Sequence, residues 1–329
     1  MIGLDSLGTV WSEIFNFSDY GQLLPLLKNS IIACVVLGIV GGLIGMFVMM
    51  RDMAFAVHGV SELSFAGAAA SLLFGASVVT GALVGSLTAA LLIGVLGARA
   101  RDRNSVTAVL MPFGLGLGIL CLGLYHGRAA NKFGLLTGQI VAIDDPQIKS
   151  LIVISVVVVV GLVVIWRPLL FASTDADVAA ARGVPVGVMS IVFMILLGLA
   201  VAVSVQIVGA LLVLSLLVTP AAAALRVSSS PVWVPLLSTA FAVTASVGGI
   251  LLAAGSSVPI SPYITTISFA IYLICRLKGA GRRGRDRCRL GRGGTADTRR
   301  SSGPRSPRLG ETSGSFPGSR RTGIEGMRR

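Results

Sequence analysis

Two ionisable side chains, His58 and Glu62, lie in an otherwise apolar stretch of the sequence. They are four residues apart, so on an α-helix both would project from the same face. An imidazole nitrogen and a carboxylate oxygen are donors for a divalent metal ion, and ionisable groups at membrane depth usually line a water-filled path or a bundle interior. Two donors are too few to close a metal site in one chain. The spacing therefore leaves two interpretations open: a polar path, or a structural pair that holds two helices together.

The composition explains why these two residues stand out. Hydrophobic residues make up 54% of the chain, charged residues only 12%, and the mean hydropathy is +0.88. Such values are typical of polytopic membrane proteins. The net charge of +13 belongs mainly to the C-terminal end, because from Arg276 onward there are 16 Lys and Arg against 4 Asp and Glu. A nucleic-acid-binding body is therefore not expected.

Apolar runs of about 20 residues, the length needed to cross a bilayer, indicate the helices that must position the pair. They predict nine transmembrane helices, at residues 22–50, 53–77, 79–98, 105–125, 147–166, 187–204, 206–225, 232–253 and 259–276. The joints around Thr80 and Gln206 have little polar punctuation, so a broken helix or a re-entrant segment would change the count to eight or ten. The predicted fold class is an all-α polytopic membrane protein, a bundle of about eight or nine transmembrane helices followed by a disordered basic tail.

The placement of charges and glycines predicts how this bundle is oriented and packed. In the nine-helix scheme most arginines between the helices fall on one side, which should be cytoplasmic, and the acidic N-terminus falls on the other. Glycines four residues apart allow helix backbones to approach closely. The pairs with this spacing are Gly38 and Gly42, Gly81 and Gly85, and Gly114 and Gly118.

The hydrophilic sequence FASTDADVAAARGVP, between two predicted membrane helices, has the features of a short capped helix. Ser173 or Thr174 is expected to cap its start, and Asp175 and Asp177 suit its positive N-terminal end. Gly183 is expected to end it. A docking surface for a soluble partner and an ordinary loop helix both fit these features.

Five stretches, in order along the chain, resemble the permease subunits of metal-type ABC importers, the family that moves zinc, manganese or iron ions. They are RDMAFAVHGVSELSFAG (51–67), FGLLTGQIVAIDD (133–145), DADVAAARGVPVGV (175–188), VGALLVLSLLVTPAAAA (208–224) and SPYITTISFAIYLICRL (261–277). The resemblance implies a multi-pass permease domain at residues 22–278 in the plasma (inner) membrane. An extracytoplasmic segment, 1–21, would precede it, and a tail rich in Arg, Gly, Ser and Pro, 279–329, would follow.

The resemblance also implies metal ligands. Arg51, Phe55, His58 and Gly67 match the family signature, in which many relatives have a second histidine at the position of Glu62. The implied metal ligands are thus His58 and Glu62, one nitrogen and one carboxylate donor per chain. Such a pair suits zinc or manganese and leaves the ion open.

Partners follow from the same resemblance. Residues 175–188 resemble the coupling helix that contacts the ATPase, which implies coupling roles for Asp175, Asp177, Ala181 and Gly183. The sequence has no GxxxxGK[ST] phosphate loop, so ATP would be used by a separate cytoplasmic ATP-binding subunit and the chain would not be an enzyme. The family arrangement adds a second permease chain, bringing two such His and Glu pairs near one axis, and an extracytoplasmic metal-binding protein that delivers the divalent ion.

Three polar residues mark the predicted outer region. His126 is at an outer helix end, and Gln139 and Asp144 follow in the same region. The resemblance makes them candidates for contact with the incoming metal or its binding protein, although a lone interfacial histidine is more often simply solvated.

Two other classes of protein fit part of the pattern. An ion-coupled secondary transporter would also use an intramembrane His and Glu, without an ATPase. A membrane scaffold would need the pair only for structure. In every case the tail beyond Lys278 is predicted to be disordered, with its first arginines able to rest on membrane lipids, and neither a bound cofactor nor a nucleic-acid partner is expected.

Overall fold

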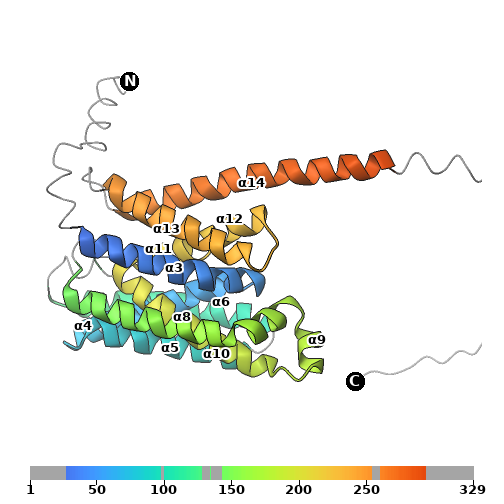
Figure 1. The fold of residues 1–329 in the computed structure, drawn as a ribbon. Coiled ribbons are helices and arrows are strands. Elements are labelled where there is room, and N and C mark those ends of the chain that lie inside the picture. The colour runs from blue at the N-terminus through green and yellow to red at the C-terminus, as the bar shows by residue number, and fades with distance from the viewer. Residues whose placement is uncertain (1–26, 98–99, 128–133, 135–142, 254–259, 294–329) are drawn as a thin grey trace, which may run out of the picture. The chain divides into compact units, whose positions relative to one another are not determined.

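The computed structural model describes residues 27–97, 100–127, 134, 143–253 and 260–293, and its elements over these residues are all helices. Eight of the described helices are long and apolar enough to cross a membrane. They are α3 (Lys28–Met50), α4 (Ala54–Leu73), α5 (Val78–Leu96), α6 (Ala100–Leu124), α8 (Asp145–Thr174), α10 (Val186–Val208), α13 (Trp233–Ala253) and α14 (Ile260–Gly293) (Figure 1). They confirm the predicted all-α transmembrane bundle.

The predicted seventh helix, 206–225, is wrong as a single span. α10 continues through Gln206, and the chain then turns at Gly209, whose φ of 87° is left-handed. Two short helices follow, α11 (Ala210–Leu217) and α12 (Thr219–Val227). Pro220 lies in the first turn of α12, where its missing N–H is tolerated, so it helps to start a new helix. The segment is therefore a broken helix, one of the alternatives that the sequence left open.

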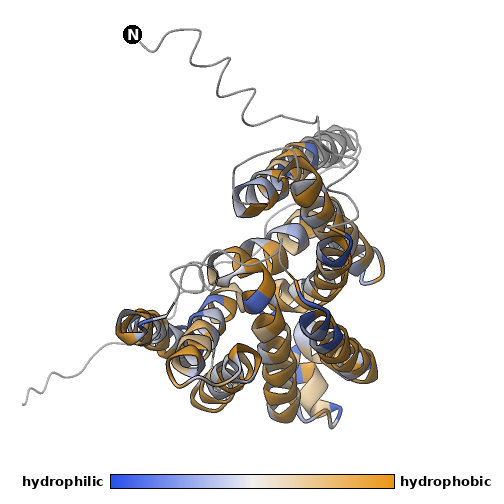
Figure 2. Cartoon of the chain, turned by 90° about the vertical axis from the view of Figure 1, so that its left-hand side faces the viewer, coloured by the Kyte–Doolittle hydropathy of each residue, from blue (hydrophilic) through white to orange (hydrophobic). Residues whose placement is uncertain are grey.

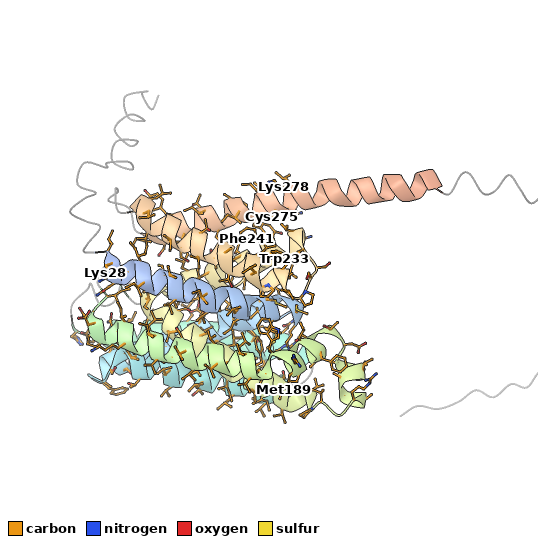
Figure 3. All side chains as sticks on the ribbon, viewed as in Figure 1. Lys28, Met189, Trp233, Phe241, Cys275 and Lys278 are labelled. Atoms are coloured by element: carbon orange, nitrogen blue, oxygen red, sulfur yellow. The ribbon has the colours of Figure 1, made fainter. Side chains whose placement is uncertain are left out.

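Together, α11 and α12 carry the chain once across the bundle. With 8 and 9 residues, each is only about 12 to 14 Å long, less than half of a bilayer core. Figure 3 shows Lys28 at one end of the bundle, and Met189 and Trp233, near the starts of α10 and α13, toward the other. The chain must return between these two starts, so the broken helix completes a crossing.

The helices pack in two groups that meet at α3, α10 and α11. α4 lies between α5 and α6, and α10 packs on α5 and α8, whereas α3 packs on α13 and α8. A Cβ added at Gly42 would overlap the backbone of Thr239, and one at Gly85 would overlap the Leu63 carbonyl oxygen. Glycines of all three predicted pairs lie at such helix contacts, which confirms their close approach.

The outer surface of the bundle is hydrophobic. Large apolar side chains such as Phe113, Val153, Val164 and Leu236 are more than half exposed. Seen from the end in Figure 2, the helices carry hydrophobic residues on outward as well as inward faces. This pattern suits a bundle whose outer solvent is lipid.

The C-terminal end departs from the prediction at its first residues. α14 continues as a helix to Gly293, beyond the boundary at residue 279 where disorder was predicted to begin. The chain divides at Gly281 into two compact units, of which the first holds the transmembrane bundle. Residues 294–329, and the predicted segment 1–21, lie outside the described residues.

Candidate metal site

α4 places both ionisable side chains on one face, as predicted. His58 and Glu62 are in its first three turns, with His58 Nε2 and Glu62 Oε1 3.7 Å apart. The histidine side chain is 27% exposed and the glutamate side chain only 4%. The pair therefore has one solvent-accessible member and one buried member.

Glycine contacts on two sides hold α4 in place around this pair. On the α5 side, a Cβ at Gly81 would overlap the Gly67 carbonyl oxygen and the Ser71 hydroxyl. On the α6 side, a Cβ at Gly114 would lie 3.0 Å from the backbone carbonyl carbon of Glu62. Because backbone meets backbone, α4 has little room to move past either neighbour.

His58 and Glu62 do not form a hydrogen bond with each other, and each keeps a buried polar atom without a partner. A separation of 3.7 Å is longer than a hydrogen bond, and Nδ1 of His58 and Oε2 of Glu62 are buried without a hydrogen-bond partner. Buried polar atoms without partners are costly, and a bound divalent cation would use the lone pairs of both groups. No group of three or more His, Cys, Asp or Glu gathers within the described residues. Further donors would have to come from outside the described part of this chain.

The turn between α3 and α4 fixes where α4 begins. The Arg51 amide donates to the Phe47 carbonyl at 3.0 Å and the Met53 amide to the Val48 carbonyl at 2.8 Å. Between them Asp52 has a φ of 52°, a left-handed conformation that Asp tolerates better than most residues. Arg103 of α6 donates its Nη2 to the Arg51 carbonyl at 3.5 Å.

Two half-buried arginines, Arg51 and Arg103, meet at this corner beside the carboxylate of Asp52. Burial lowers the pKa of the Arg51 guanidinium below its ordinary value, and the charge of Arg103 lowers it further. Arg51 lies over the ring of Phe193 in α10, with 5.7 Å from its Cζ to the ring centroid. Sequence reasoning used Arg51 and Arg103 as markers of the cytoplasmic side, and Arg51 also as part of a signature. It missed their contact with each other and with Phe193, because contacts between distant helices leave no local spacing.

The predicted capped helix is present as α9 (Ala176–Ala181), at the right-hand end of the bundle in Figure 1. Asp175 is its N-cap and accepts from the Val178 amide at 3.0 Å. The prediction that Ser173 or Thr174 caps it is wrong, because both hydroxyls donate to carbonyls within α8. Gly183, with φ 84°, follows the end of the helix as predicted.

The surface of α9 is open to a partner. Asp175, Asp177, Ala181 and Gly183 are all exposed, whereas Ala179 is buried against the chain itself. Val178 is 46% exposed and adds an apolar contact to this surface. The structure thus places the predicted coupling residues together, in α9 and at its two ends, all of them exposed.

The predicted outer residues do not join the His58–Glu62 pair. α4 and α6 run in the same direction, since Gly59 faces Thr107 and Phe65 faces Gly118. His126 follows the end of α6, 12 residues past the glycine that faces Glu62, or about 18 Å along the helix direction. His126 is exposed, Asp144 is an exposed residue before α8, and Gln139 lies outside the described residues.

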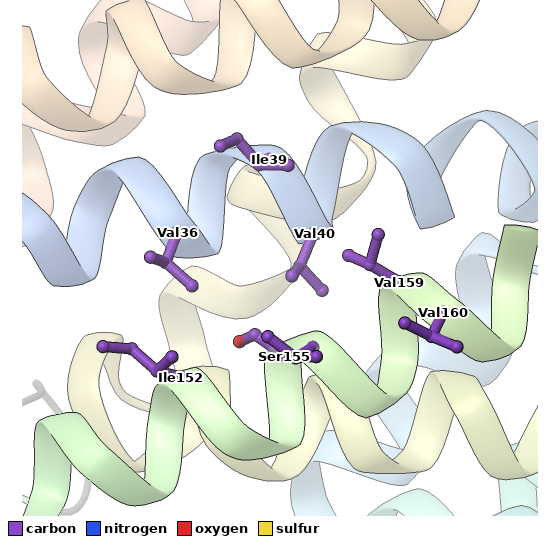
Figure 4. A pocket seen from close by; sticks show the side chains of 8 residues that line it. Val36, Ile39, Val40, Ile152, Ser155, Val159 and Val160 are labelled. Atoms are coloured by element: carbon purple, nitrogen blue, oxygen red, sulfur yellow. The ribbon is translucent and has the colours of Figure 1, made fainter.

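A pocket between α3 and α8 is not a metal site. Its volume is about 210 Å³, and valines and isoleucines line it (Figure 4). The hydroxyl of Ser155 is its polar group, buried without a hydrogen-bond partner. Without an imidazole or carboxylate, the pocket lacks the donors for a transition metal.

Comparison with known proteins agrees with this fold. Residues 24–279 match the ABC 3 transport family, and the chain belongs to this family. It is 30% identical over 263 residues to "Manganese import system permease protein ScaB" of Streptococcus parasanguinis, covering 79% of this chain and 93% of that one. It is 28% identical over 240 residues to "Manganese transport system membrane protein MntC" of Halalkalibacterium halodurans, covering 73% and 82%.

A solved structure supports the same assignment. The structure "PsaBC from Streptococcus pneumoniae in complex with Fab" has a TM-score of 0.69 and 29% identity, covering 76% of this chain and 90% of its own. With eight candidate membrane spans among the described residues, the chain is a multi-pass plasma-membrane permease of the metal-type ABC importer family. It is a transport protein by family, not an enzyme.

Proposed function

We propose that this chain forms the translocation path of an ATP-driven importer of divalent transition-metal ions, with His58 and Glu62 as ligands of the ion in transit. The observation that carries the proposal is the unpartnered state of the pair. Oε2 of Glu62 and Nδ1 of His58 are buried without hydrogen bonds, and the two side chains are too far apart to satisfy each other. If the pair were purely structural, the two side chains would be expected to form a hydrogen bond with each other.

Manganese is the ion that the chemistry and the relatives favour together. Carboxylate oxygen is a donor suited to Mn²⁺, whereas sites richer in imidazole and thiolate favour zinc. Both curated relatives described above are named as manganese transport proteins. Zinc and iron are the competitors that an uptake experiment must include.

A second permease chain would complete the site. One chain offers one nitrogen and one oxygen donor, which is half of a four-donor set. A two-fold axis next to α4 would bring two copies of the pair together, since such symmetry places the same surface of each chain at the contact. The 27% exposure of the histidine side chain leaves a face through which these donors could meet.

α9 would couple ATP hydrolysis by the partner subunit to transport. An exposed, capped helix between two membrane spans suits docking to a cytoplasmic ATP-binding subunit, with Asp175, Asp177, Ala181 and Gly183 at the contact. At the opposite end, His126 and Asp144 would face the extracytoplasmic metal-binding protein that delivers the ion. This assignment makes the α9 end of the bundle cytoplasmic.

Transport in proteoliposomes tests the function. The chain, reconstituted with its ATPase and binding protein, should take up radioactive manganese only when ATP is hydrolysed, and an uncoupler of the proton gradient should have no effect. Excess zinc and iron should compete less well than unlabelled manganese. Uptake that follows a proton gradient without the ATPase would contradict the proposal and favour a secondary transporter.

A further inference from the structure

The two helices that flank α9 converge on one aromatic residue of α3. α8 ends at Thr174 and is separated from α9 by Asp175 alone, and α10 begins at Val186, a few residues after α9 ends. Trp166 of α8 and Phe193 of α10 both pack against Phe47 of α3. The ring centroids are 4.9 Å apart at 83° for Trp166 and 6.0 Å apart at 61° for Phe193, both edge-to-face contacts.

The same cluster reaches α4 through a cation. Arg51 begins the tight turn that leads into α4, and its guanidinium lies over the Phe193 ring at 5.7 Å. Its own amide is bonded to the carbonyl of Phe47. Arg51 therefore contacts the ring of Phe193 through its side chain, while its backbone amide closes the last turn of α3 at Phe47. Seven residues later on the same chain is His58.

The two arginines at this cluster also lack some of their hydrogen-bond partners in the present conformation. Nη1 of Arg51 and Nε of Arg103 are both buried without a hydrogen-bond partner, although the two cations are near enough to affect each other. Arg51 and Arg103 are half-buried, and although the Asp52 carboxylate is near enough to stabilise the charge of Arg103, the unpartnered N–H groups of the two cations still oppose this arrangement. A second arrangement that separates them or supplies acceptors would compete with it, and such an element responds to a push from outside.

We propose that Arg51, seated on the ring of Phe193, is a positioning residue that transmits the movement of α9 to α4, and so couples ATP hydrolysis by the partner subunit to release of the metal ion from His58 and Glu62. The inference rests on the proposed function. A movement of the α8 and α10 ends shifts Trp166 and Phe193, the shift displaces Arg51, and Arg51 moves the start of α4.

The test compares variants in the complete complex in proteoliposomes, with two readouts. One is the number of manganese ions transported per ATP hydrolysed, and the other is the manganese bound without nucleotide. Arg51→Met and Phe193→Leu should each lower the transport ratio about fivefold or more, while ATP hydrolysis and bound manganese stay at the native level. Phe193→Tyr keeps the ring and should behave as native. Arg167→Met removes an exposed arginine from α8 and is the matched control.

The double variant and the binding readout decide the interpretation. Arg51→Met combined with Phe193→Leu should be no worse than either single change, because both break the same link. An unchanged ratio, fully additive effects, or bound manganese falling in parallel with transport would overturn the inference. If the Arg51→Met variant fails to assemble with the ATPase, the transport ratios of Phe193→Leu and Phe193→Tyr are compared instead. A lower ratio for Phe193→Leu alone supports the inference, and equal ratios overturn it. A native complex that neither binds nor transports manganese would instead contradict the proposed function itself.

Discussion

α4 and α9 both carry polar residues for which we propose partners outside this chain, but α4 is buried and α9 is exposed. α4 is buried between α5 and α6, and its carboxylate is 4% exposed with one oxygen lacking a partner. α9 is exposed over most of its length, and the carboxylate of its N-cap, Asp175, already accepts a hydrogen bond from the Val178 amide. This difference is what the proposed function requires, in which a small cation binds at α4 and a protein surface docks on α9.

The largest effect is expected from the buried member of the pair. Glu62→Gln keeps the shape of the side chain and removes its charge, so manganese uptake should fall by more than about tenfold. The matched control is Ser61→Ala on the same helix, where the buried hydroxyl donates to the His58 carbonyl of its own helix at 2.8 Å. Uptake at the native level by Glu62→Gln in metal-depleted cells would contradict the proposal that Glu62 binds the ion.

Packing around α4 should show the next largest effect. Gly114→Ala puts a Cβ 2.7 Å from Leu63 Cδ1 and 3.0 Å from the backbone at Glu62. We expect a loss of about 1 to 3 kcal/mol in stability and a lower midpoint of thermal unfolding for the purified chain. Gly116→Ala, in the same helix but with open space around it, should lower neither, because Ala favours a helix more than Gly does. Equal midpoints for the two variants would contradict the close contact between α6 at Gly114 and the backbone of α4.

A smaller change is expected at α9. Asp175→Ala removes the acceptor for the Val178 amide, and a cap of this kind stabilises a helix by about 1 kcal/mol. The affinity for the ATPase, measured with the permease in nanodiscs, should fall about fivefold. Asp175→Asn keeps an acceptor and should bind nearly as well. If both variants lose the same affinity, the negative charge matters and the cap does not.

The C-terminal tail should matter least. A chain truncated after Lys278 keeps α4, α9 and all but the last of the residues matched by the family, which end at 279. Its manganese uptake should equal that of the full chain at equal expression. A clear loss of uptake would assign the tail a role that neither helix supplies.

Local patterns allowed most of these elements to be predicted. Apolar length located the spans, glycine spacing located the contacts at Gly42, Gly85 and Gly118, and a short polar run located α9. Each of these features depends on residues close together in sequence.

The failures depend on longer-range physics. The break at Gly209 is a local exception: its left-handed backbone lies inside a continuous apolar run, so hydropathy left a broken helix open but did not locate the break. The link between Arg51 and Phe193 joins residues 142 positions apart and has no periodic signal. The free atoms of His58 and Glu62 are also a property of the folded chain, because spacing places the side chains on one face but does not set their 3.7 Å separation.

Direct measurement of bound metal tests the central claim. The purified permease in complex with its ATPase, equilibrated with manganese and washed, would be measured for bound metal by mass spectrometry and by electron paramagnetic resonance. The account predicts one tightly bound ion per pair of permease chains, lost in Glu62→Gln and His58→Ala and retained in Ser61→Ala. The same amount of bound manganese in all four proteins would contradict it.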